Sequence, residues 1–377
     1  MSIRRGLIAV VVGGSVAACA SEPGVIGPPA DVPFSPQDVA ASIFSLRFAA
    51  DNIAVASVGT ITDALGLTTP GFSAAPRRYE RGVAPRGAIV PSFKPGSLRK
   101  LVADRAVRLS QGARNAVPLF PINFLGQTFV FDATTDSYVI DAARGGAPSD
   151  GVRFILYRLD PASRLPALPL APFGFVDLTD ESDAVSTRLR VRAFDTAGGD
   201  LPLANYLIDG AFGSVSSGVI VNLLTEGFIV DADGRFDFNL DETMETDDAR
   251  GVTIATLDHR VISDEGTSTR LRVEGDIAND GSHSDLGFLF DINGSAGASE
   301  VDIRVVDGRQ DGVIRHRGQT EVLISGTVAQ PDYQAPRGGG FFADEIAALD
   351  EILFGIDDVL IMADELFRPL GELFGVR

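Results

Sequence analysis

The sequence predicts a mainly β protein: an antiparallel meander with an internal duplication, on which a helix from each end of the chain is packed. The hexapeptide Ser-Thr-Arg-Leu-Arg-Val occupies residues 186–191 and again residues 268–273. Around both copies apolar and polar residues alternate, which is typical of half-buried strands. Asp-Gly and Asn-Gly pairs, which favour tight hairpin turns, separate these segments. The pairs are Asp233-Gly234, Asp280-Gly281, Asn293-Gly294, Asp307-Gly308 and Asp311-Gly312.

The duplication extends beyond the hexapeptide. At the same separation of 82 residues, residues 206–209 match residues 288–291, and Val221 matches Ile303. A small insertion would then place Gly227 on Gly312. Repetition at a fixed separation indicates one structural unit used twice. We therefore expect two related meanders in one curved sheet, half-barrel or sandwich. The expected repeats are residues 184–245 and 266–328, within a β domain of residues 70–330.

Composition limits the classes of partner. The chain has 377 residues, 45% of them hydrophobic, which is enough to form the core of one large domain or two ordinary ones. Its formal net charge is −19, with 51 acidic and 32 basic residues. Such a charge repels nucleic acids and anionic membrane surfaces. Neither is therefore an expected partner of the folded domain.

The N-terminal residues predict an export signal. Arg4 and Arg5 precede an apolar run over residues 7–18, which is too short to span a membrane as a helix. The run ends in Val-Ala-Ala followed by Cys19, the only cysteine of the chain. This segment resembles the lipobox of bacterial lipoproteins. The resemblance implies that residues 1–18 are a signal peptide, with cleavage between Ala18 and Cys19. It also implies a diacylglycerol on the sulfur of Cys19 and an acyl chain on its new amino group.

The same resemblance predicts where the protein resides. Lipid chains on Cys19 would anchor it to a membrane of the cell envelope. By resemblance to enterobacterial sorting, Ala20 in place of aspartate favours the outer membrane. Arg4 and Arg5 also partly resemble a twin-arginine signal, so two export routes stay open. Residues 19–34 are rich in proline and glycine and are interpreted as a lipidated tether. No cofactor is expected besides the covalent lipid.

A helix is expected after the tether, within an N-terminal helical segment of residues 35–69. Ser35 is a suitable N-cap, Pro36 suits the first helical position, and Asp38 is the acid expected in the first turn. Apolar residues then recur at helical spacing, beginning with Val39 and Ile43. The amount of alanine and phenylalanine on the remaining positions predicts a helix that is buried on most sides.

Several strands can be placed before and between the repeats. Residues 127–132 and 137–141 look like a hairpin, residues 152–159 form an apolar strand, and residues 251–262 bridge the repeats. Within the first repeat the arginines at 188, 190 and 192 share one side of a strand, opposite Leu189 and Val191. We interpret this arginine row as a solvated face. Polyanion binding is the alternative, and the acidic residues on neighbouring strands oppose it.

Residues 341–377 predict an amphipathic C-terminal helix. Asp-Glu or Asp-Asp pairs begin at residues 350, 357 and 364, and they form one acidic stripe that we expect to face water. Pro369 is expected to end or kink the helix. We expect the helix to dock on its own sheet, with contact to a partner or lipid as the alternative. The apolar positions are Ile346, Leu349, Leu353, Ile356, Leu360, Ala363, Phe367, Leu370 and Phe374.

No catalytic or metal-binding pattern is evident. Ser97 and Lys100 have the Ser-x-x-Lys spacing of penicillin-recognising enzymes, but the Lys-Thr-Gly element of that family is missing, so we reject the match. The three histidines, His259, His283 and His316, lie far apart, which disfavours a zinc site. Acidic turns such as residues 231–234 resemble calcium loops without their closing glutamate. Turn chemistry explains them, and calcium bridging between loops stays an alternative.

Two functions follow as hypotheses. The first is a non-enzymatic structural or interaction protein of the envelope, with a protein partner. The second is a carrier or sensor of an apolar ligand held between the sheet and the terminal helices, by fold-level analogy with periplasmic lipoprotein carriers of the half-barrel type. A cavity in the structure would favour the carrier, and a filled core the structural role. The residues expected to line such a cavity are Phe228, Phe236, Phe238 and Phe288.

Overall fold

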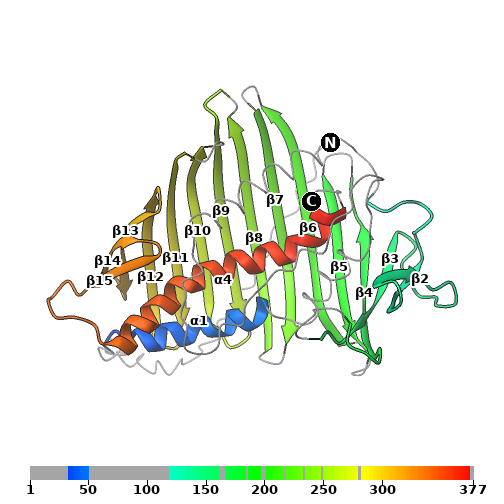
Figure 1. Cartoon of the computed structure of the whole chain (residues 1–377), viewed down its shortest axis with the longest axis horizontal. Coiled ribbons are helices and arrows are strands. Elements are labelled where there is room, and N and C mark those ends of the chain that lie inside the picture. Colours follow the sequence, from blue (N-terminus) through cyan, green and yellow to red (C-terminus); the bar gives the residue numbers. More distant parts are fainter. Residues whose placement is uncertain are drawn as a thin grey trace, which may run out of the picture. The chain divides into compact units, whose positions relative to one another are not determined.

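The described residues form a curved open sheet of 15 strands and two helices, one on the N-terminal and one on the C-terminal side of the sheet in the sequence (Figure 1). The computed structural model describes residues 33–50, 119–160, 166–183, 186–196, 201–215, 218–231, 234–247, 249–278 and 282–373. The expected signal peptide, Cys19 and nearly all of the tether lie outside the described residues. So do residues 51–118, which include Ser97, Lys100 and the end of the expected N-terminal helical segment.

The predicted meander is confirmed. From β3 to β15 every strand pairs antiparallel with the next strand of the chain. At one edge, β1 pairs antiparallel with β2 and parallel with β3. The elements are α1 (Pro36–Ala50), β1 (Thr128–Asp132), β2 (Ser137–Ile140), β3 (Gly151–Tyr157), β4 (Pro172–Asp180), β5 (Thr187–Asp195), β6 (Leu201–Val215), β7 (Gly218–Asp231), β8 (Gly234–Asp247), β9 (Val252–Ser263), β10 (Ser268–Ala278), β11 (Ser284–Gly294), β12 (Gly297–Val306), β13 (Arg309–His316), β14 (Gln319–Thr327), β15 (Gln330–Gln334) and α4 (Ala343–Leu373).

Among the predicted turn pairs that the structure describes in full, Asn293-Gly294 and Asp307-Gly308 lie at hairpin ends. Asp307 and Gly308 join β12 to β13 with φ angles of 50° and 81°, the left-handed conformation that tight hairpin turns need. Asp311-Gly312 is an exception, because both residues lie inside β13. Gly312 is opposite Ile303, and a Cβ there would stand 2.4 Å from the carbonyl oxygen of Asp302. The glycine therefore permits a close approach of two strands.

The first two strands of the repeats share one template. In the β5–β6 hairpin Leu189 is opposite Ile208, and in the β10–β11 hairpin Leu271 is opposite Phe290, at the equivalent positions. Leu189 and Leu271 are both fully buried. Equal register and equal burial are what a duplicated unit requires.

Beyond these strands the residue-by-residue match is wrong. Val221 is opposite Phe212, whereas Ile303 is opposite Phe288. Gly227 lies in β7, whereas Gly312 lies two strands after β11, in β13. The cause is hairpin length, because β6 and β7 have 15 and 14 residues while β11 and β12 have 11 and 10. The second copy therefore reaches its turn sooner, and the pairing shifts.

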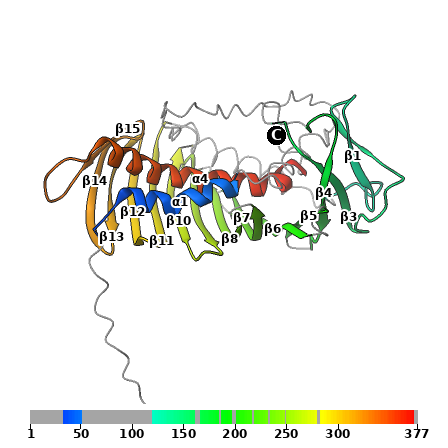
Figure 2. The ribbon, with the colours of Figure 1, turned by 90° about the horizontal axis from the view of Figure 1, so that it is seen from below.

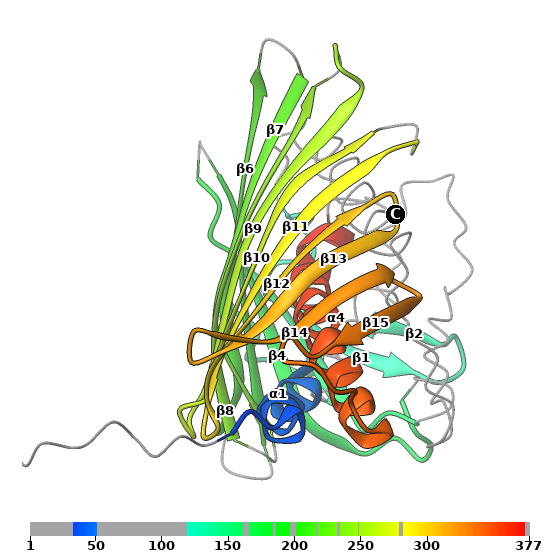
Figure 3. The ribbon, with the colours of Figure 1, turned by 90° about the vertical axis from the view of Figure 1, so that its left-hand side faces the viewer.

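Both helices lie on the same side of the sheet (Figures 2 and 3). We call the covered side the inner face and the opposite side the outer face. The predicted cap of α1 is confirmed, since Ser35 Oγ accepts a hydrogen bond from the amide of Asp38 at 3.3 Å. Helix α4 continues through Pro369 to Leu373, so an end of the helix at this proline is wrong, while the alternative of a kink stays a prediction. Proline cannot donate the backbone hydrogen bond of a helix, and packing of the buried residues Leu366, Phe367 and Pro369 keeps the helix continuous there.

None of the described helices combines the length and apolar character that crossing a bilayer would require.

Candidate functional site

The inner face is apolar along continuous cross-strand rows. Leu240, His259, Leu271, Phe290 and Val301 are directly opposite one another across β8 to β12, and all are buried. Cross-strand contacts of this kind stabilise a sheet. The face is too hydrophobic to be left in water, so a cover is needed.

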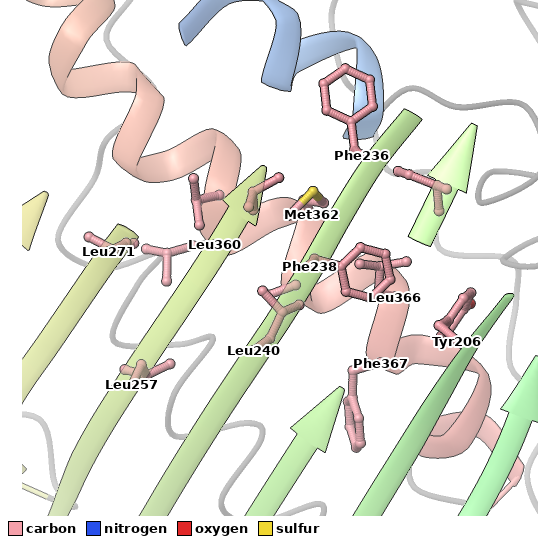
Figure 4. Packing of buried hydrophobic residues seen from close by; sticks show 14 of the residues in the cluster. Tyr206, Phe236, Phe238, Leu240, Leu257, Leu271, Leu360, Met362, Leu366 and Phe367 are labelled. Carbon is pink, nitrogen blue, oxygen red and sulfur yellow. The ribbon is translucent and has the colours of Figure 1, made fainter. Parts of the chain in front are cut away.

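Three of the four predicted lining residues lie on this inner face. Phe236, Phe238 and Phe288 are buried in the core. Figure 4 shows Phe236 and Phe238 in one layer with Met362 and Leu366 of α4, and all four belong to one hydrophobic cluster.

The expectation for Phe228 is wrong. It lies on the outer face, half-buried, where the guanidinium carbon of Arg235 sits 3.8 Å from the centre of its ring. The reason is the alternation of β7, which places Gly227 and Ile229 inward and Phe228 outward. Gly227 must stay a glycine there, because a Cβ would meet Tyr206 at 2.5 Å.

The described residues enclose a small cavity beneath α4. It measures about 30 Å³ and lies between α4 and the strands from β11 onward. It is lined mainly by apolar side chains, among them Phe288, Ile303 and Phe354, with Gln310 and Asp350 as polar members. Room for roughly one or two water molecules is all that this volume offers. The Nε2 atom of Gln310 is buried without a hydrogen-bond partner among the described residues, and Asp350 accepts a hydrogen bond from the Tyr333 hydroxyl at 2.6 Å.

The acidic stripe of α4 does not simply face water. Burial raises the pKa of Asp357 to about 7, with a further contribution from the charge of Asp358. Asp357 is half-buried, so the expectation that it faces water is only partly correct. Asp350 is likewise engaged, by Tyr333 of β15. The cause is the breadth of the apolar surface around the stripe, which packs the helix closely enough to enclose part of the acidic row.

Two buried polar pairs interrupt the inner face. His259 Nε2 lies 2.9 Å from Glu242 Oε1, and both side chains are almost completely buried. Ser299 Oγ lies 2.9 Å from His316 Nδ1, also in a buried pair. Burial, with a smaller effect of the Arg317 charge, lowers the pKa of His316 and favours its neutral form.

Neither pair forms a triad with another described residue. The second ring nitrogens, Nδ1 of His259 and Nε2 of His316, are buried without a described hydrogen-bond partner. A nucleophilic serine needs a histidine that a third group orients. His283 is elsewhere, exposed and beside Asp307 at 3.0 Å. Among the described residues no group of three or more histidine, cysteine or acidic side chains could hold a metal ion.

The outer face carries the expected arginine row of β5 and its counterpart in β10, in which Arg188, Arg190, Arg270 and Arg272 pair with acids. Arg188 contacts Asp209 at 2.6 Å, and Arg272 contacts Asp291 at 2.8 Å. The duplicated sequence does not duplicate every pair, since Arg270, the counterpart of Arg188, contacts Asp258 of β9 instead. This pairing neutralises much of the positive charge and opposes polyanion binding.

A groove of about 880 Å³ crosses the outer face from β8 to β13. Its lining is almost wholly polar. The side chains of Arg260, Asn239, Asp241 and Asn293 form no hydrogen bond or ion pair with another described residue, although side chains of their neighbours in the groove do. The lining residues are Asn239, Asp241, Asp258, Arg260, Ser268, Arg270, Asp291, Asn293, Ala298, Glu300, Arg315 and Gly318, and the groove also borders Thr269 and Ser299, whose side chains are buried.

Searches against protein-family models, curated proteins and solved structures return no match. Function is therefore argued from geometry. Sequence reasoning missed the groove because its members meet only through the register of six strands. It also missed the Glu242–His259 pair. The alternation of β8 contained a signal for that pair, since Phe236, Phe238 and Leu240 place Glu242 on the same face.

Proposed function

We propose that this chain is a lipid-anchored protein of the cell envelope with a non-enzymatic structural or interaction role. The observation that carries the proposal is the closed inner face. Helices α1 and α4 cover its apolar rows, and the cavity beneath α4 measures about 30 Å³. Pockets that hold small ligands measure roughly 300–1,000 Å³. The apolar face of the sheet is thus covered by the protein's own helices, and the polar outer face is left for contacts with other molecules.

The anchor is part of the proposal. The lipobox ending at Cys19 supports lipidation, and Ala20 supports the outer membrane. Substituting Cys19 by serine removes the thiol that would receive the diacylglycerol. We expect labelled palmitate to be incorporated into the parent chain and not into Cys19→Ser, and the variant to leave the membrane fraction. Palmitate on the Cys19→Ser chain would refute the anchor.

A non-enzymatic role is supported by how the buried polar groups are used. Glu242 contacts His259, and Ser299 contacts His316, inside the core. Each contact satisfies one ring nitrogen of a buried histidine within an apolar layer, which is a structural role.

A carrier of an apolar ligand is the second candidate. The cavity beside α4 favours it, because Phe288 and Ile303 give it apolar walls and the unpartnered Gln310 Nε2 lines it. A buried donor without a partner costs about 1–3 kcal/mol, so a ligand acceptor there would be stabilised. The segment of α4 around Phe354 would have to move outward to admit such a ligand.

Titration of the purified Cys19→Ser chain with a fluorescent fatty acid separates the two candidates. The structural role predicts no saturable binding. The carrier predicts saturable binding that is weakened when Ile303→Trp fills the cavity, with circular dichroism as the check that this variant folds. Binding that Ile303→Trp abolishes in a folded chain would replace our first proposal by the second.

A further inference from the structure

The groove on the outer face is built from one cross-strand row. Asn239 is opposite Arg260, Arg260 is opposite Arg270, and Arg270 is opposite Asp291. Glu300 continues the row beyond Asp291. Like charges directly opposite each other destabilise a sheet, and the row contains two such contacts, Arg260 with Arg270 and Asp291 with Glu300. An arrangement of this kind needs an explanation beyond the stability of the sheet.

Three of these four charged side chains form ion pairs with residues outside the row. Arg270 contacts Asp258 at 2.5 Å, Asp291 contacts Arg272 at 2.8 Å, and Glu300 contacts Arg315. Arg260 is left without a partner among the described residues. Across the strand from it, Asn239 likewise has its amide uncommitted. The groove therefore offers donors and acceptors that the fold does not use.

The charge of the lining excludes charged polymers. Four carboxylates, those of Asp241, Asp258, Asp291 and Glu300, face three guanidinium groups in the groove. A polyanion meets these carboxylates and a chain of net charge −19, whereas a polycation meets the arginines. The near balance of charges suits a ligand that is itself uncharged.

The lining also excludes apolar ligands and peptides. Among the described residues that line the groove, Ala298 carries the only apolar side chain, and none is an aromatic residue that could anchor a protein partner. Strands β8 to β13 are interior strands, paired on both sides. A peptide therefore finds no free edge to extend in this part of the sheet.

We propose that the outer groove is a binding site for a neutral oligosaccharide. A sugar hydroxyl both donates and accepts hydrogen bonds, so it can use carboxylates, guanidinium groups and side-chain amides together. The volume of about 880 Å³ lies within the range of ligand sites. Arg260 and Asn239 are the specificity-determining residues. This inference rests on the proposed interaction role and names its ligand class.

Isothermal titration of the Cys19→Ser chain tests the site with maltohexaose, cellohexaose, mannohexaose and chitohexaose. We expect saturable binding of at least one of them, unaffected by salt. Arg260→Ala and Asn239→Ala should each weaken it about tenfold, a loss comparable to one or two hydrogen bonds. Arg304→Ala is the matched control, because Arg304 lies on the same outer face, pairs with Asp285 and does not line the groove. Circular dichroism confirms the fold of each variant.

Three results would overturn the proposal. The first is no binding of any of the four oligosaccharides at millimolar concentration. The second is binding that Arg304→Ala weakens as much as Arg260→Ala does. The third is binding of heparin alone, decreasing with salt, which would indicate a polyanion site. The fatty-acid and palmitate measurements are independent of these results, so failure of the groove leaves the proposed structural role standing.

Discussion

Replacing Gly355 by alanine tests the contact between the two helices. Gly355 lies in α4, and a Cβ added there would stand 2.6 Å from Ile43 Cγ2 and 3.2 Å from Phe290 Cε1. Neither neighbour can move cheaply, since Ile43 is β-branched and both side chains are buried. The glycine therefore forms a notch in α4 where α1 and the sheet meet it.

Two opposing free energies decide the outcome. Overpacking a core by one methyl group costs about 1–3 kcal/mol. Replacing a helical glycine by alanine recovers about 1 kcal/mol of helix propensity. A contact of 2.6 Å falls at the severe end of overpacking, so the net effect is a destabilisation of about 1–2 kcal/mol. Thermal unfolding followed by circular dichroism should show a melting temperature lower by a few degrees.

A double-mutant cycle assigns this loss to the helix contact. Ile43→Ala alone should cost about 2–5 kcal/mol, because it empties a buried site. In that background Gly355→Ala should become neutral or stabilising, since the clashing methyl group is gone. Gly340→Ala is the control, with no heavy atom within 4 Å of the new Cβ. If Gly355→Ala keeps full stability and shows no coupling to Ile43→Ala, the helices do not pack as described.

Further predictions concern the charges and the cover of the inner face. The folded-state pKa of Asp357 lies near 7, above its unfolded value near 4, so stability should fall as pH rises between these values. Asp357→Asn should abolish that dependence and, at pH above 7, raise the unfolding free energy in urea by on the order of a few kcal/mol; unchanged pH dependence would contradict the burial of Asp357. Glu242→Leu alone should lower the free energy of unfolding by about 1–3 kcal/mol, because it leaves His259 without its partner. The double variant Glu242→Leu/His259→Leu should recover most of this loss. If calorimetry shows no recovery of stability in the double variant, these two residues stabilise the fold through more than their contact with each other. Leu360→Ala, at a buried position, should cost about 2–5 kcal/mol. Ile346→Ala, at a position 40% exposed, should change the free energy of unfolding by no more than about 0.5 kcal/mol. Equal losses for Leu360→Ala and Ile346→Ala would mean that α4 packs on the sheet through another face.

Local chemistry allowed much of this fold to be predicted. The alternation in Phe236, Phe238 and Leu240 and the turn at Asp307-Gly308 depend on neighbours a few residues away. The same holds for the cap at Ser35. A meander adds strands in sequence order, so local hairpins were sufficient to predict the topology of β3 to β15.

Expectations that needed distant contacts were less successful. Phe228 was placed on the wrong face because the apolar run around it conceals the alternation of β7. Gly227 and Gly312 were aligned by type, although hairpins of different length put them in non-equivalent strands. The helical stripe alone predicts that Asp357 faces water, whereas packing around α4 covers this side chain in part.

By itself, the sequence determined the elements, their order and the apolar inner face, because strand periodicity, turn residues and caps act over short separations. Tertiary structure alone decided how α1 enters the notch at Gly355, how little space is left beneath α4, and which outer side chains share the groove. Arg260 and Arg270 are brought together by the register of β9 and β10, and register depends on where each hairpin turns and which face is buried. These are properties of the assembled sheet, and no single stretch of the chain contains them.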